Sequence, residues 1–251
     1  MKSLLSATLH RIHRGTLLLQ IFGTAGFLLL GCLWLEIPDS HLWQLAFTVL
    51  VGLVVVVGLL LLQVIIVRRL RQALQPPPIW LSAVLAVAWI IILMLLCGSI
   101  ARLGINSDVR ASYWNSQLGP YLRTIFTYPR LSAWQDDAIS FAYWILVPSL
   151  LLPCVIETIA SGVSAASWRS GLRILRLWYH WVAVIVILWF VYWIQPKLLD
   201  WHPLHTVRGE LVSVVLRFAF LYCAEMLALT FLIAFIAELL SRDHAVRYPA
   251  P

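Results

Sequence analysis

The sequence contains few charged residues for its length. Only 12% of its 251 residues are charged, while 62% are hydrophobic. Soluble globular domains contain about 25% charged residues, so this composition excludes an ordinary soluble domain. The mean hydropathy of +0.90 agrees with a polytopic membrane protein.

The alternating short strands of an outer-membrane barrel are missing from the sequence, whereas long apolar runs are frequent. A helix that crosses a bilayer core about 30 Å thick needs roughly 20 apolar residues. Six runs meet this requirement, at about 16–35, 42–67, 79–100, 138–160, 177–195 and 211–240. We therefore predict an all-α fold, a bundle of six transmembrane helices that forms a single membrane domain over residues 1–251.

No cysteine lies in a predicted loop. The four cysteines all fall within the apolar runs: Cys32, Cys97, Cys154 and Cys223. A disulfide framework on either aqueous face is therefore excluded, and we expect these thiols to pack as small apolar groups.

Motifs for several chemistries are also absent. The sequence has no Walker A loop, no HExxH and no GxSxG. A membrane haem needs histidines at mid-depth on facing helices, and only His180 lies near a predicted span. We predict no cofactor and no catalytic residue.

The basic residues are unevenly distributed between the two faces that the runs define. One face receives eleven of the 18 Lys and Arg residues, and the other receives six: Arg102, Arg110, Arg123, Arg130, Lys197 and Arg208. Basic residues near helix ends stay on the cytoplasmic side, so both termini are predicted inside a bacterial inner membrane. The pI near 9.6 is then a signal of topology, and the predicted partner is the lipid bilayer, not nucleic acid.

The N-terminal segment has a basic start, an apolar stretch and a Gly31-Cys32 pair that faintly resembles a lipoprotein cleavage site. Leu30 fits such a site poorly, and five further runs anchor the chain. We expect an uncleaved first helix.

Residues 101–137 are too polar to span a membrane and too aromatic for a free linker. We predict one or two short amphipathic helices at the outer surface, broken at Gly119-Pro120 and ended near Pro129. The alternatives are a loop packed over the bundle and a docking surface for a partner subunit.

The last run contains three charged residues at different depths. Arg217 lies near the outer boundary, where its side chain can reach the headgroups. Glu238 can pair with Arg242 at i,i+4 spacing. Glu225 lies at mid-span, so it must be protonated, paired or beside a polar cavity. It is either a proton or substrate site or a protonated packing group bonded to a neighbour such as Gln20 or Gln63.

The fourth run contains Pro148 and Pro153, which favour a bent helix, and Glu157 follows one turn later. Broken helices beside a carboxylate line many transporter sites, so Glu157 joins Glu225 and Arg217 as a candidate for a substrate or proton path. The alternative is an ion pair between Glu157 and Arg169 or Arg173.

One outer loop contains Asp200, His202 and His205, which are possible ligands for Zn²⁺ or Cu²⁺. No helix fixes their spacing, so we predict no metal there and retain them only as weak candidates. The sequence as a whole favours a non-catalytic membrane component of a transport or assembly system, with a partner subunit or as a homo-oligomer. The alternative is a small membrane enzyme acting on a lipid or surface substrate at the outer face.

Overall fold

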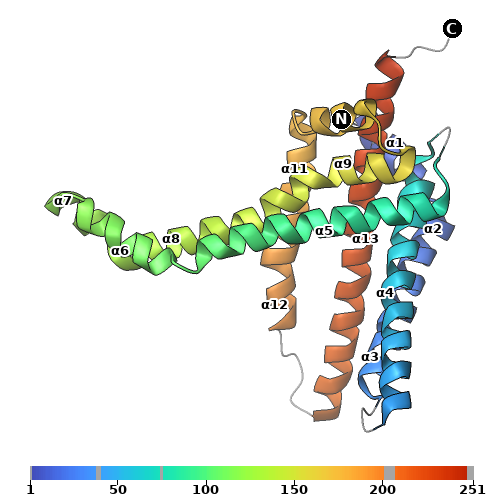
Figure 1. The fold of residues 1–251 in the computed structure, drawn as a ribbon, viewed down its shortest axis with the longest axis horizontal. Coiled ribbons are helices and arrows are strands. Elements are labelled where there is room, and N and C mark those ends of the chain that lie inside the picture. The colour runs from blue at the N-terminus through green and yellow to red at the C-terminus, as the bar shows by residue number, and fades with distance from the viewer. Residues whose placement is uncertain (1, 38–40, 74–75, 201–206, 248–251) are drawn as a thin grey trace. The chain divides into compact units, whose positions relative to one another are not determined.

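The structure is a computed structural model that describes residues 2–37, 41–73, 76–200 and 207–247. Every regular element among these residues is a helix, which confirms the all-α prediction. Figure 1 shows the path of the chain, in which long helices alternate with short ones.

Six helical stretches of the described residues are long and apolar enough to cross a membrane, as predicted. Their bounds are Arg14–Leu35, Leu42–Arg71, Ile79–Gly104, Tyr128–Ser161, Trp178–Leu199 and Gly209–Asp243. Each of them overlaps one predicted run. The largest difference is at the fourth, which begins ten residues before the predicted start at 138.

Three of these stretches, the first, fourth and fifth, are continuous helical runs made of two α-helices joined by a π-helical turn. The elements in chain order are α1 (Lys2–Arg11), α2 (Arg14–Leu18), α3 (Thr24–Leu35), α4 (Leu42–Arg71), α5 (Ile79–Gly104), α6 (Ser107–Gln117), α7 (Pro120–Ile125), α8 (Tyr128–Phe141), α9 (Val147–Ser161), α10 (Ala165–Ile174), α11 (Trp178–Trp189), α12 (Gln195–Leu199) and α13 (Val207–Arg247).

Three π-helical turns interrupt these runs, at Leu19–Gly23, Ala142–Leu146 and Phe190–Ile194. Two of them come one turn before a proline, Pro148 and Pro196. A proline lacks an N–H and its ring collides with the carbonyl four residues earlier, so the preceding turn must widen. The prolines therefore account for two of the π turns, and the helices continue through them.

The chain divides into two compact units, residues 1–86 with 153–251 and residues 87–152. In the first unit, α13 is the central helix and contacts α1, α4, α10, α11 and α12, as well as the π turn at Leu19–Gly23. The prediction of a single membrane domain remains a prediction.

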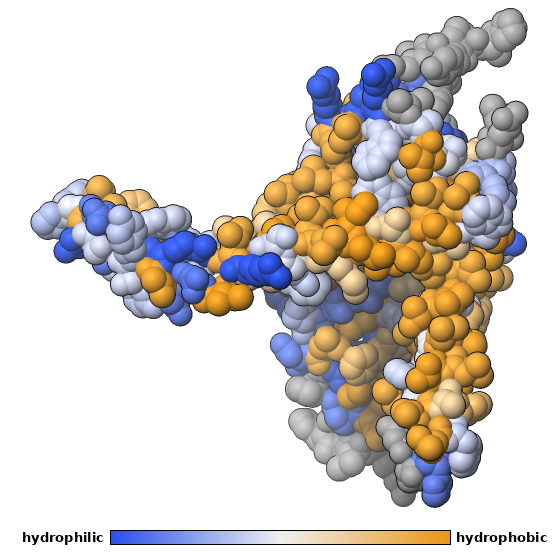
Figure 2. All heavy atoms as spheres, viewed as in Figure 1, coloured by the Kyte–Doolittle hydropathy of each residue, from blue (hydrophilic) through white to orange (hydrophobic). Residues whose placement is uncertain are grey.

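Burial along α4 changes between its two halves. Its first half exposes apolar side chains, among them Leu42 at 87% and Trp43 at 67%. Its second half buries Ile66 and Leu70 completely. Figure 2 shows the exposed half of α4 as a continuous hydrophobic surface, which in a soluble protein would be unstable in water. This surface is suited to lipid contact.

The second unit contains the end of α5, α6, α7, α8 and the π turn that follows. The thiol of Cys97 in α5 donates to the Tyr143 carbonyl over 3.8 Å, so these two runs lie side by side (Figure 1). The predicted break at Gly119-Pro120 is confirmed, because Gly119 precedes the first residue of α7. The predicted end near Pro129 is also confirmed, because α7 ends at Ile125 and a new helix, α8, begins at Tyr128. Pro129 stands in the first turn of α8, where its missing N–H removes no helical hydrogen bond.

Candidate functional site

Two buried side chains of opposite charge meet where α4 ends against α9. Arg71, the last residue of α4, donates from Nε to Oε2 of Glu157 over 2.8 Å, and from Nη2 to Oε1 over 3.4 Å. The Glu157 side chain is 1% exposed and that of Arg71 is 9% exposed. Such a two-point contact fixes both the position and the orientation of the guanidinium group. The predicted alternative partners of Glu157, Arg169 and Arg173, are therefore replaced by Arg71.

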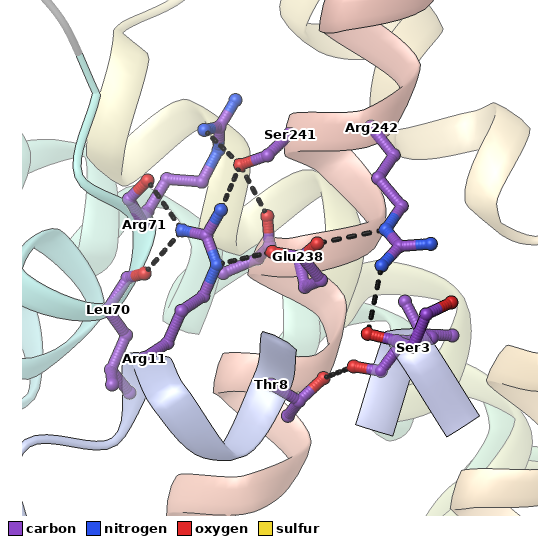
Figure 3. Close-up of polar contacts among 10 residues, drawn as sticks. Ser3, Thr8, Arg11, Leu70, Arg71, Glu238, Ser241 and Arg242 are labelled. Atoms are coloured by element: carbon purple, nitrogen blue, oxygen red, sulfur yellow. Dashed lines mark hydrogen bonds and ion pairs between the residues drawn. The ribbon is translucent and has the colours of Figure 1, made fainter. Parts of the chain in front are cut away.

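A second carboxylate lies close by, on α13. Glu238 accepts from Nε of Arg11 over 2.6 Å and from Nε of Arg242 over 2.9 Å, and Figure 3 shows the two arginines on either side of it. The predicted i,i+4 pair of Glu238 with Arg242 is confirmed. Arg11 adds a contact from α1, which lies 227 residues away in sequence.

Ser241 joins the two ion pairs. Its hydroxyl accepts from Nη2 of Arg11 over 2.8 Å and from Nη1 of Arg71 over 3.2 Å (Figure 3), and it donates to the Ala237 carbonyl of its own helix. We name this group the Glu238 cluster, with the members Arg11, Arg71, Glu157, Glu238, Ser241 and Arg242. It connects four helices: α1, α4, α9 and α13.

Arg11 also stabilises the end of α4. The last carbonyls of a helix have no partner within the helix and carry partial negative charge. Nη1 of Arg11 donates to the carbonyls of Leu70, over 3.2 Å, and Arg71, over 3.5 Å. The chain then leaves the helix through Gln72, whose φ of 50° is left-handed. The guanidinium group therefore occupies the place that water fills at an exposed helix end.

The opposite end of the α13 span contains a similar arrangement. Arg217 donates to Oε1 of Glu210 over 2.8 Å and to the Leu199 carbonyl at the end of α12, also over 2.8 Å. Its side chain is 8% exposed. Its hydrogen bonds direct the side chain toward the end of the span, and the expectation that it reaches the headgroups remains a prediction. We name Arg217, Glu210 and the carbonyls of Leu198 and Leu199 the Arg217 cluster.

Glu225 lies between these clusters and is half-buried. Its Oε1 accepts a hydrogen bond of 2.8 Å from Nε2 of Gln195, the first residue of α12. The suggested partners Gln20 and Gln63 are therefore not the one found. A neutral amide neighbour neither fixes nor neutralises a negative charge, in contrast to the arginine partners of Glu157 and Glu238.

Two of the weak metal candidates, His202 and His205, lie outside the described residues, and Asp200 is exposed after the end of α12. Among the residues that the structure describes, no three His, Cys, Asp or Glu side chains are grouped to hold a metal ion. All four cysteines are free thiols.

Sequence reasoning missed the structural role of Arg11 and Arg71. Both were interpreted only as residues that set the topology. A signal was available: Glu157 and Glu238 lie near the same predicted face, and buried carboxylates require cations close by. The sequence could not indicate which of the basic residues on that face would supply them.

No protein-family model matches the chain, and neither does any curated protein or solved structure. The class of protein therefore follows from the fold and the charge contacts alone. Six apolar helical runs among the described residues define a multi-pass α-helical membrane protein.

Proposed function

We propose that this chain is a non-catalytic membrane component of a transport or assembly system. The Glu238 cluster is the observation that carries the proposal. A catalytic carboxylate must face its substrate, whereas Glu157 is 1% exposed and both of its oxygens bind Arg71. The cluster uses its charges to hold α1, α4, α9 and α13 together. Rigid attachment of helices is what a scaffold or a transport subunit requires.

The proposal includes a bacterial inner membrane with both termini in the cytoplasm, supported by the excess of basic residues on one face. Reporter fusions test it. A reporter that is active only in the cytoplasm should be active when fused at residues 72 and 170. A reporter that is active only outside the cytoplasm should be active when fused at 115 and 204. A fusion at 115 active only in the cytoplasm would reverse the orientation.

Glu225 is the proposed polar residue of a substrate or proton path. Among the described residues, it is the one of the three candidates that forms no ion pair: Glu157 binds Arg71, and Arg217 binds Glu210. A carboxylate whose partner is a neutral amide is not engaged by a guanidinium group, so it is the better placed of the two glutamates to bind a substrate or a proton. We assign Glu157 and Arg217 to the support of the helices.

The enzyme alternative is favoured by one feature of the second unit. A shallow hollow of about 510 Å³ is lined by Asp108, Val109, Ser112, Tyr113, Ser116 and Tyr128. Asp108 accepts from the hydroxyls of Ser132, over 2.7 Å, and Tyr128, over 3.2 Å. An exposed carboxylate among hydroxyl groups could bind a sugar or lipid headgroup, but the arrangement of these groups does not define a particular reaction.

Purification from the native host after mild cross-linking separates the two functions. A component of a larger system should purify with another membrane protein in fixed stoichiometry, and Asp108→Asn should leave both the complex and the cellular phenotype unchanged. A chain that purifies alone, and whose phenotype is lost in Asp108→Asn at normal expression, would support the enzyme instead.

A further inference from the structure

Helix α10 has two distinct faces. Ser170, Gly171 and Ile174 are buried, and they occupy one side of the helix at 100° per residue. Trp168, at 41% exposure, and Leu172, at 55%, lie on the other side. A short helix that buries small residues and exposes a tryptophan and a leucine is typical of a helix lying in a membrane interface.

The buried face is held by close packing and by charge. A Cβ atom at Gly171 would stand 2.9 Å from the Cα of Cys154 in α9, so only glycine permits this approach. On α13, Asp243 accepts from Nη1 of Arg173 over 3.4 Å and lies within 3.5 Å of the Ser170 hydroxyl. The orientation of α10 is therefore fixed, and its outer face is available for another molecule.

Two arginines flank the exposed apolar residues. Arg169 is on the outer side of α10, and Arg176 lies in the turn that leads to Trp178, where a membrane-spanning stretch begins. Both side chains are exposed, and neither makes an ion pair or hydrogen bond within the described part of the chain. Residues 158–199 contain no Asp or Glu, so no nearby carboxylate in sequence offsets them.

We propose that this face binds the headgroups of anionic phospholipids. We name it the α10 lipid face and define it by Trp168, Arg169, Leu172 and Arg176. Its position next to the first residue of a spanning stretch puts it at headgroup depth, where tryptophan is favoured. The two arginines supply the positive charge that a phosphate diester recognises, while Trp168 and Leu172 contact the first acyl carbons.

Titration of the purified full-length chain with phosphatidylglycerol in a neutral detergent tests the proposal, with the thermal unfolding midpoint as readout. Phosphatidylglycerol should raise the midpoint, and phosphatidylcholine should raise it much less. The double variant Arg169→Gln/Arg176→Gln should bind phosphatidylglycerol roughly 30-fold more weakly, since each basic side chain near an anionic surface contributes about 1 kcal/mol. Because neither side chain has a hydrogen bond or ion pair to lose within the described residues, the midpoint without lipid should not change.

A matched control removes the same charge elsewhere. The side chains of Arg102 and Arg110 also make no hydrogen bond or ion pair within the described part of the chain, and they belong to the second unit. Arg102→Gln/Arg110→Gln should keep the wild-type affinity within about twofold. Leu172→Ser tests the apolar part without changing charge and should weaken binding about tenfold.

Three results would overturn the proposal. In the first, phosphatidylglycerol and phosphatidylcholine raise the unfolding midpoint equally. In the second, the two double variants lose the same affinity for phosphatidylglycerol. In the third, soluble glycerol phosphate raises the midpoint at the same concentration as the lipid. The last result would identify a site for a free phosphate ester, not for a lipid.

Discussion

The two ends of the α13 span use the same chemical arrangement with different numbers of partners. At one end, Arg11 binds Glu238 and the last carbonyls of α4; at the other, Arg217 binds Glu210 and the last carbonyls of α12. In each case a guanidinium group neutralises a carboxylate and caps a helix C-terminus. The Glu238 cluster then adds a second, more deeply buried ion pair, Arg71 with Glu157, joined through Ser241.

The difference indicates which parts of the first unit are held together by ion pairs and which part tolerates substitution. The Glu238 cluster connects four helices, so the loss of one member leaves other charges buried beside it. Within the described residues, the hydrogen bonds of the Arg217 cluster join α12 to α13. Glu225, between them, has a neutral partner. We therefore expect the cost of substitution to decrease from the Glu238 cluster to the Arg217 cluster and then to Glu225.

The largest effect is expected at Glu157. Glu157→Gln leaves Arg71 buried without a counter-charge, and the loss of one partner of a buried pair lowers the free energy of unfolding by about 3 to 5 kcal/mol. The measurement is equilibrium unfolding in mixed detergent and dodecyl sulfate. The double variant Arg71→Met/Glu157→Met removes both charges and should recover most of the loss. A loss below about 1 kcal/mol for Glu157→Gln would show that the pair is reached by water.

Arg242→Gln provides the control for this comparison. Arg242 also binds Glu238, but its side chain is 45% exposed. Exposed i,i+4 pairs contribute about 0.3 to 0.5 kcal/mol, so this variant should unfold almost as the wild type does.

A smaller effect is expected at the other end of the α13 span. Arg217→Gln removes the ion pair with Glu210 and the bonds to the α12 carbonyls, and hydrogen bonds to charged groups contribute about 1.5 to 3 kcal/mol. The same unfolding assay should show a loss of about 2 kcal/mol. Cysteine labelling of a Leu199→Cys variant should also become faster when Arg217 is replaced, because the end of α12 is released. A loss as large as that of Glu157→Gln would remove the distinction between the two clusters.

The sequence was sufficient to predict the six spans, because a bilayer imposes a length and an apolar composition that single runs reveal. It was not sufficient to predict charge partners. Arg71 and Glu157 are 86 residues apart, and Arg11 and Glu238 are 227 apart. Only the packing of helices determines such pairs. The start of the fourth span was placed ten residues too late for a local reason: Pro129 was interpreted as the end of a helix, and a proline is equally compatible with starting one.

Glu225 is expected to show a small effect on stability and a separate effect on function. Glu225→Gln keeps an oxygen that can accept from Gln195, so the unfolding free energy should not change. Glu225→Leu removes the interhelical hydrogen bond and should lower it by about 1 kcal/mol. If Glu225 serves a proton or substrate path, Glu225→Gln should abolish the cellular phenotype at normal expression. An unchanged phenotype would contradict the path and leave Glu225 as a packing group.

A small effect, and the only one expected to raise the stability, is at Gln20. This side chain is fully buried, with Nε2 only 3.4 Å from the sulfur of Met226 and Oε1 without a hydrogen-bond partner in the described structure. A buried amide oxygen without a partner is unfavourable, and a sulfur acceptor returns little of that energy. Gln20→Met keeps the shape and should raise the unfolding free energy by about 0.5 kcal/mol.

Tyr222→Phe is the matched control, because it changes a contact between the same two helical segments and should lower the unfolding free energy, whereas Gln20→Met should raise it. The Tyr222 hydroxyl donates to the Ile21 carbonyl over 2.6 Å, within the π turn at Leu19–Gly23, where the widened helix leaves carbonyls to be satisfied from outside. Loss of this bond should lower the unfolding free energy by about 1 kcal/mol. If Gln20→Met also lowered it by that amount, the Gln20 oxygen would have to bind a water molecule or a ligand within the membrane. The region beside Met226 and Glu225 would then contain a polar space. Such a space would distinguish the middle of α13 from its two ends, where ion pairs hold the helices together.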